Sequence, residues 1–131
     1  MRFIVRNEEI SKIECYLLDE CVGYINYYFT RNGVWLNKIV VNKEYRNKGI
    51  GTALVKIFEN ESLNMRKRIV EGKYFPEGEE DSVVRGFYKK HGYSISKEGY
   101  ETEIFKNLQI KHDLKDLNIE YFETAKNVGR H

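Results

Sequence analysis

Short runs of apolar residues alternate with polar positions along the N-terminal part of the chain. These runs are rich in Ile, Val, Tyr and Phe, and they predict strands at residues 3–5, 13–18, 22–29 and 34–41. A short connection at residues 18–21, with Asp19 and Glu20 at its centre, joins the second and third runs, and Arg31-Asn32-Gly33 supplies a turn before the fourth. This part of the chain is therefore predicted to form an antiparallel meander.

The hydrophobic period then becomes helical. The apolar residues of the next segment recur three and four positions apart, at Leu54, Ile57, Phe58 and Met65. The polar residues of this segment fall mostly on the opposite face: Lys56, Glu59, Asn60 and Glu61. We predict a helix over residues 51–65, followed by a strand at 68–72.

A second, shorter helix is predicted after a polar and acidic loop at residues 76–81. Asp81 or Ser82 is a candidate cap for this helix, and Gly92 supplies a left-handed end. Two further strands are predicted at residues 93–96 and 100–108. The order of these elements indicates a single α/β (α+β) domain built on one sheet.

The C-terminal segment again has three- and four-residue spacing. Its apolar positions are Ile110, Leu114, Leu117, Tyr121, Ala125 and Val128. They predict an amphipathic helix from Lys111 to about Asn127, closed by Gly129. We therefore divide the chain into a domain over residues 1–107 and a C-terminal helical extension over 108–131, packed on the domain or on a partner subunit.

Composition and charge narrow the function classes. The chain has 131 residues, with 22 basic and 20 acidic side chains and a formal net charge of +2. This near balance argues against a dedicated nucleic-acid binder, and no apolar run is long enough to suggest a membrane span. The first residues are too few and too charged for a signal peptide, and Cys15 and Cys21 lack a zinc-ligand pattern, so we expect a cytoplasmic protein with reduced thiols and no metal.

The segment with the clearest chemistry follows the fourth predicted strand. Arg46-Asn47-Lys48-Gly49-Ile50-Gly51 is a basic, glycine-containing turn that opens a helix. Glycines let backbone N–H groups converge, and the positive end of a helix favours an anion, so the turn fits a phosphate or pyrophosphate. Its spacing does not match a Walker loop or a dinucleotide fingerprint. The alternative is a strand-to-helix turn that binds nothing.

Two motifs together resemble the GNAT superfamily of N-acyltransferases. The first is the Arg-x-x-Gly-x-Gly of residues 46–51, and the second is the segment 81–93, with Phe87-Tyr88 on a helix before Gly92-Tyr93. The resemblance covers about residues 12–107. It implies a twisted, mixed and mostly antiparallel sheet with flanking helices, in which the fourth and fifth strands splay apart, and it implies acetyl-CoA as co-substrate.

The resemblance also implies roles for particular residues. It assigns the pyrophosphate of acetyl-CoA to the backbone N–H groups of Arg46, Asn47, Lys48, Gly49, Ile50 and Gly51, reinforced by Thr52, and it pairs Val41 with the pantetheine arm. Tyr88 stands where family members carry a tyrosine that protonates the departing thiolate. A buried core aromatic is the alternative role for Tyr88. Lys89 either meets the ribose phosphate of CoA or lies on a solvated helix face.

The group that removes the proton from the attacking amine is left open by the sequence. The predicted fourth strand has no acidic residue, and Glu71 on the fifth is the best carboxylate candidate for the base, with a solvated surface glutamate as the alternative. His91, expected to be exposed after the helix, and an ordered water are further candidates. Residues 7–12 leave no room for a full helix, so the acceptor groove is open, or is completed by the C-terminal helix or a second subunit of a homodimer.

We therefore expect an N-acetyltransferase that moves the acetyl group of acetyl-CoA to a primary amine by direct attack in a ternary complex. The acceptor is a small-molecule amine or a protein amino group, and no nucleic acid or membrane is involved. The alternative is a non-catalytic CoA-binding or protein-interaction module that retains the GNAT fold.

Overall fold

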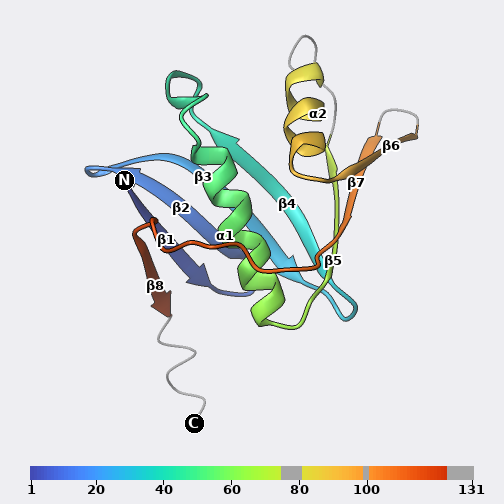
Figure 1. The fold of residues 1–131 in the computed structure, drawn as a ribbon, viewed down its shortest axis with the longest axis horizontal. Helices are drawn as coiled ribbons and strands as arrows, with labels where there is room; N and C mark the ends of the chain where they lie inside the picture. Colours follow the sequence, from blue (N-terminus) through green and yellow to red (C-terminus); the bar gives the residue numbers. More distant parts are fainter. Residues whose placement is uncertain (75–80, 99–100, 124–131) are drawn as a thin grey trace.

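The computed structural model describes residues 1–74, 81–98 and 101–123, which form one eight-stranded sheet and its helices (Figure 1). The strands are β1 (Arg2–Asn7), β2 (Ser11–Leu17), β3 (Glu20–Phe29), β4 (Val34–Val41), β5 (Ile69–Tyr74), β6 (Ser94–Glu98), β7 (Glu101–Asn107) and β8 (Ile119–Glu123). The helices are α1 (Ile50–Asn64) and α2 (Asp81–Lys90), with a 3-10 turn, η1 (Lys43–Tyr45), before α1. No helix in these ranges is both long and apolar enough to span a bilayer.

The strand order in the sheet is β6-β7-β5-β4-β3-β2-β1-β8. Neighbouring strands run antiparallel except β4 with β5 and β1 with β8, which confirms a mixed and mostly antiparallel sheet. β4 and β5 pair through only three residue pairs, of which Leu36↔Gly72 is the last. Beyond this pair β4 and β5 no longer pair with each other. The predicted separation of the fourth and fifth strands is therefore confirmed.

A β-bulge accompanies this divergence. Asn26 of β3 pairs with Lys38 of β4, but the adjacent Tyr27 pairs with Leu36, so Asn37 is an extra residue in β4. Bulges bend a strand and increase its twist. The bulge directly follows Leu36, at the point where β4 leaves β5.

α1 packs against β2, β3 and β4 on one face of the sheet (Figure 1). Leu54, Ile57 and Phe58 of α1 are fully buried, together with Ile25 and Tyr27 of β3. α2 lies on the same side, because Phe87 contacts the start of α1. No described helix covers the opposite face, which we call the open face.

The predicted C-terminal helix is wrong over residues 111–123. Figure 1 shows that the chain after β7 runs across α1 before it reaches β8. β8 pairs parallel with β1, from Phe3↔Ile119 to Asn7↔Glu123, and the Phe3 N–H donates to the Asn118 carbonyl at 2.8 Å. The tail thus satisfies the open edge of β1, and this pairing outweighs the local helical period. The rest of the predicted helix, at 124–127, lies outside the described residues.

This crossing segment also corrects the predicted polar face of α1. Glu59 is 2% exposed and Asn60 is 9% exposed, because residues 108–118 cover the side of α1 that faces away from the sheet. The Asn60 side-chain amide bonds both the carbonyl and the N–H of His112, at 2.9 and 2.8 Å. α1 is therefore enclosed between the sheet and the C-terminal segment.

Candidate active site

The turn between β4 and α1, which we call the cradle (residues 46–52), has the backbone form of an anion site. Asn47 and Gly49 have positive φ values of 64° and 82°. The N–H groups of residues 47–52 have no acceptor within the described part of the chain, whereas that of Arg46 donates to the Lys43 carbonyl at 3.4 Å. Unpaired N–H groups at the start of a helix favour an anion. The backbone thus has the form of an anion site, and the N–H of Arg46 is the one predicted donor that already has an acceptor among the described residues.

The Arg46 side chain joins this cradle to the end of β4. Its Nε donates to the Val41 carbonyl at 3.1 Å. Val41 itself pairs with Gly23 of β3 and has no partner in β5, so it lies beside the gap between the splayed strands. The structure therefore brings the predicted Val41 and the cradle together.

The last turn of α2 supports the cradle from the other side. A Cβ built on Gly51 would lie 2.9 Å from Cε1 of Phe87, so the backbone of α1 approaches this ring closely. The Thr52 hydroxyl lies 3.2 Å from Nε2 of His91, and the His91 ring packs on Phe87. Burial, and next to it Lys90, lowers the pKa of His91, which favours the neutral imidazole. Thr52 thus positions His91, which is half-buried and not exposed as predicted.

Lysines near the cradle remain on the surface. Lys48 lies in the turn and Lys89 in the last turn of α2, and both are exposed. The alternatives for Lys89, a phosphate contact or a solvated face, are both compatible with this position.

Tyr88 lies in an aromatic cluster next to the end of β5. It is 5% exposed, stacks on Tyr74 with ring centroids 5.7 Å apart, and meets the edge of Tyr93. No described residue offers a hydrogen-bond partner to its hydroxyl. Burial raises the pKa of the Tyr88 phenol well above its usual value, so at neutral pH the group keeps its proton.

Asp81 is the first residue of α2 rather than a cap ahead of it. Its carboxylate accepts from the Tyr74 hydroxyl and from the Arg85 guanidinium, both at 3.4 Å. These contacts fix Tyr74, which in turn stacks on Tyr88.

Glu71 and Tyr88 lie on opposite faces of the sheet. Successive residues of a strand point to opposite faces, so Tyr74 and Gly72 share the helix-covered face and Glu71 points to the open face. Glu71 is exposed there and has no ion-pair or hydrogen-bond partner among the described residues. The two predicted catalytic residues therefore do not touch each other, and β5 separates them.

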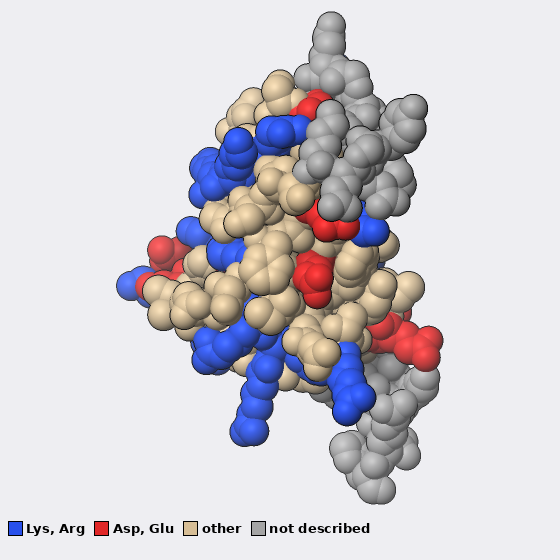
Figure 2. Space-filling view, turned by 90° about the vertical axis from the view of Figure 1, so that its right-hand side faces the viewer, with Lys and Arg blue, Asp and Glu red and all other residues tan. Residues whose placement is uncertain are grey.

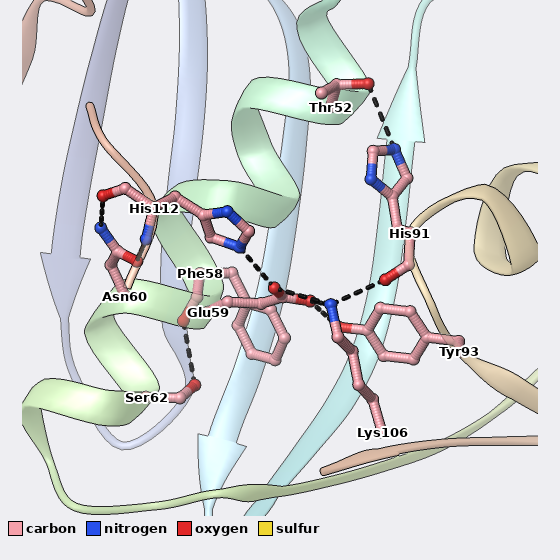
Figure 3. A network of polar contacts seen from close by, with 9 residues as sticks. All are labelled: Thr52, Phe58, Glu59, Asn60, Ser62, His91, Tyr93, Lys106 and His112. Carbon is pink, nitrogen blue, oxygen red and sulfur yellow. Dashed lines mark hydrogen bonds and ion pairs between the residues drawn. The ribbon is translucent and has the colours of Figure 1, made fainter. Parts of the chain in front are cut away.

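A buried polar network links the cradle to the C-terminal segment (Figure 3). Glu59 accepts from Tyr93 Oη at 2.8 Å and from Lys106 Nζ at 2.9 Å, and it lies 2.7 Å from Nε2 of His112. Lys106 also donates to the His91 carbonyl at 2.7 Å. Sequence reasoning missed this network, and the only available signal was a glutamate beside the apolar stripe of α1. Within the described ranges, no group of three or more His, Cys, Asp or Glu side chains could hold a metal ion.

Comparison with known proteins gives a family match. The model of the acetyltransferase (GNAT) domain matches residues 3–95, which is more than half of the chain. No curated protein sequence matches.

Solved structures with the same fold include the PaiA N-acetyltransferase from Thermoplasma acidophilum in complex with coenzyme A, at a TM-score of 0.68 and 20% identity over 76% of this chain and 61% of that one. An aminoglycoside 6'-N-acetyltransferase complexed with coenzyme A is similar at a TM-score of 0.62 and 22% identity, over 82% of this chain and 77% of that one. An aminoglycoside 6'-acetyltransferase type Ii has a TM-score of 0.67 and 23% identity over 81% and 74%. This chain spans less than two thirds of the PaiA chain.

Proposed function

Since the chain belongs to the GNAT acetyltransferase family, we propose that it transfers the acetyl group of acetyl-CoA to a primary amine. The observation that carries the proposal combines two features. The N–H groups of residues 47–52 have no acceptor among the described residues, and strands β4 and β5 part directly beside them. Two of the similar structures are complexes with coenzyme A, which supports the same ligand here.

The backbone N–H groups of the cradle would bind the pyrophosphate, and Arg46 would orient the turn against Val41. When bound, acetyl-CoA would supply the acetyl group as a thioester, whose sulfur leaves with a negative charge. Tyr88 holds a proton on a buried phenol with no partner in the described chain, and it is our candidate to donate that proton to the sulfur.

The amine arrives protonated at neutral pH and must lose a proton before its lone pair can attack. Glu71, which has no described partner and is exposed on the other side of β5, is our candidate to accept that proton. The proposal thus has the cofactor bound on the helix-covered face and the acceptor entering from the open face. The acceptor is a small-molecule amine, as for the aminoglycoside acetyltransferases with the same fold.

Tyr88→Phe tests this assignment. We expect kcat to fall by about 100-fold or more, because the proton donor is lost, while the Kd for CoA changes by less than about threefold. Thiol release would be followed across a panel of amines, and CoA affinity would be measured by calorimetry.

Tyr27→Phe is the matched control. Tyr27 is also a buried tyrosine whose hydroxyl has no described partner, but it lies in the core against Phe58. Its variant should keep wild-type kcat. Equal kcat for wild type and Tyr88→Phe would remove Tyr88 from the mechanism. CoA binding without transfer to any amine would favour a non-catalytic CoA-binding module.

A further inference from the structure

One row of side chains crosses the open face beside the point where β4 and β5 part. The strand register places Trp35 next to Glu71, Glu71 next to Phe105, and Phe105 next to Ser94. Paired residues of adjacent strands share a face, so all four side chains point away from α1. The Glu71 carboxylate therefore stands between two aromatic side chains.

Glu71 is the one charged residue of this row. The next row contains Lys73 and Glu103, which form an ion pair at 3.8 Å. Glu71 has no ion pair or hydrogen bond with any residue of the described ranges. In Figure 2, which faces the side of the molecule with β6 and β7, two acidic patches lie near the middle, the upper one beside a basic side chain and the lower one among uncharged surface. Most basic side chains in this view lie along the left and the bottom.

The two rows line a hollow. Its volume is about 210 Å³, enough for an ammonium group and a short alkyl chain. Its charged wall residues are Glu71, Glu103 and Lys73, and its aromatic ones are Trp35 and Phe105. Phe105 is 44% exposed, so much of its ring is accessible to a ligand. Aromatic faces attract cations through their quadrupole, and a carboxylate adds a direct charge. Because Lys73 pairs with Glu103, the carboxylate of Glu71 remains to face a ligand, and the lining suits a cation with apolar substituents.

The row is adjacent to the proposed reaction site. Trp35↔Glu71 is followed by Leu36↔Gly72, the last pair before the strands diverge. A ligand held by the row would therefore lie one residue pair from the gap.

We propose that the Trp35–Glu71–Phe105 row is the acceptor subsite and selects aliphatic amines that carry positive charge and no acidic group. That the bound cation is the acceptor of the acetyl group rests on the proposed function. That the row binds a cation does not. A carboxylate on the acceptor would face Glu71 and be repelled. Besides being the candidate base, Glu71 is then a specificity-determining residue: its loss lowers kcat for every acceptor and in addition raises KM for cationic acceptors.

Trp35 is the only tryptophan of the chain, so its fluorescence reports directly on this row. We would titrate the protein with choline, which no acetyl group can modify at nitrogen, and with 3,3-dimethyl-1-butanol, its neutral isostere. We expect a saturable change with choline, a Kd at least about 10-fold weaker for the isostere, and a similar weakening in Glu71→Gln and Phe105→Leu. Glu120→Gln, at the far edge of the same face, should bind choline like the wild type.

Transfer kinetics supply the second readout. We expect kcat/KM for 1,5-diaminopentane to exceed that for 5-aminopentanoate by at least about 10-fold. In Glu71→Gln this ratio should approach one, mainly because KM for the diamine rises. Choline binding that is absent, or equal in wild type and Glu71→Gln, would overturn the subsite even if transfer occurs. Glu71-dependent choline binding without any transfer would keep the subsite as a cation site and overturn the proposed acetyltransferase function.

Discussion

Two glycines at the start of α1 meet different physical requirements. Gly49 adopts φ = 82°, a left-handed conformation in which L side chains are strained. Gly51 has an ordinary conformation but lies so close to Phe87 that a Cβ would overlap the ring. The first glycine shapes the turn, and the second allows α2 to support it.

Gly51→Ala should therefore weaken CoA binding by moving either Phe87 or the cradle. We expect the Kd for CoA to rise about 10-fold and the stability to fall by about 1–2 kcal/mol, as for other overpacked sites. Calorimetry and urea unfolding would measure the two effects. Phe87→Leu in the same chain should restore part of the affinity, because the smaller side chain leaves room for the methyl group. A Gly51→Ala variant with unchanged Kd would show that the contact with Phe87 does not shape the cradle.

Much of the cradle could be predicted from the sequence, since its residues are consecutive and the turn is encoded locally. The partners of these residues could not. Thr52 meets His91 and Gly51 meets Phe87 only after β5 returns the chain to the same face of the sheet. Similarly, the sequence singled out Glu71 but not its neighbours Trp35 and Phe105, which depend on the register of three strands.

At the scale of elements, α1 shows that hydrophobic periodicity alone does not predict which polar side chains of a helix are buried. The pattern predicted the helix and its apolar face, and the structure confirms the helix and the burial of Leu54, Ile57 and Phe58. Met65, which was also assigned to the apolar face, follows the helix and is 55% exposed. The pattern assigned Glu59 and Asn60 to solvent because a polar side chain is usually exposed, and sequence alone gives no sign that another segment will cross the helix. Their burial depends on Tyr93, Lys106 and His112, up to 53 residues away.

Glu59→Gln tests how strongly this network holds the elements together. The variant keeps the shape of the side chain but leaves Lys106 partly buried without its counter-charge. Breaking a buried pair from one side costs about 3–5 kcal/mol; since Lys106 is 21% exposed, we expect the loss to be nearer ~2–3 kcal/mol in urea unfolding.

Glu61→Gln provides the comparison, with the same substitution two residues further along α1. Burial raises the pKa of Glu61, so folding disfavours its charged form relative to the unfolded chain. We expect the free energy of unfolding of Glu61→Gln to stay within about 0.5 kcal/mol of the wild-type value. Equal effects of the two substitutions would mean that the Glu59 network adds no specific stability.

At the scale of the whole molecule, the two faces of the sheet are unequal. Both helices and the segment 108–118 lie on one face, and the described chain leaves the other uncovered. The connection between β1 and β2 spans only residues 8–10, so no helix is inserted there. This arrangement supports the proposal that the helix-covered face binds the cofactor and the open face binds the acceptor.

The C-terminal segment completes this architecture, because β8 covers the edge of β1. The apolar spacing of this segment is helical, but its residues 119–123 form a strand. Leu114, Leu117 and Ile119 pack against the core, and β8 pairs with β1 through five residue pairs. We propose that residues 108–123 belong to the same folding unit as the domain, and not to a separate extension.

A chain ending at Asn118 tests this. Loss of β8 leaves the β1 edge unpaired, and exposed strand edges promote association. We expect the free energy of unfolding to fall by about 1–3 kcal/mol and the truncated chain to self-associate with rising concentration, measured by circular dichroism melts and light scattering after gel filtration. A chain ending at Glu123 keeps every described residue and sets the baseline. If the two chains melted alike and had the same mass at all concentrations, β8 would be dispensable and the folding unit would end before it.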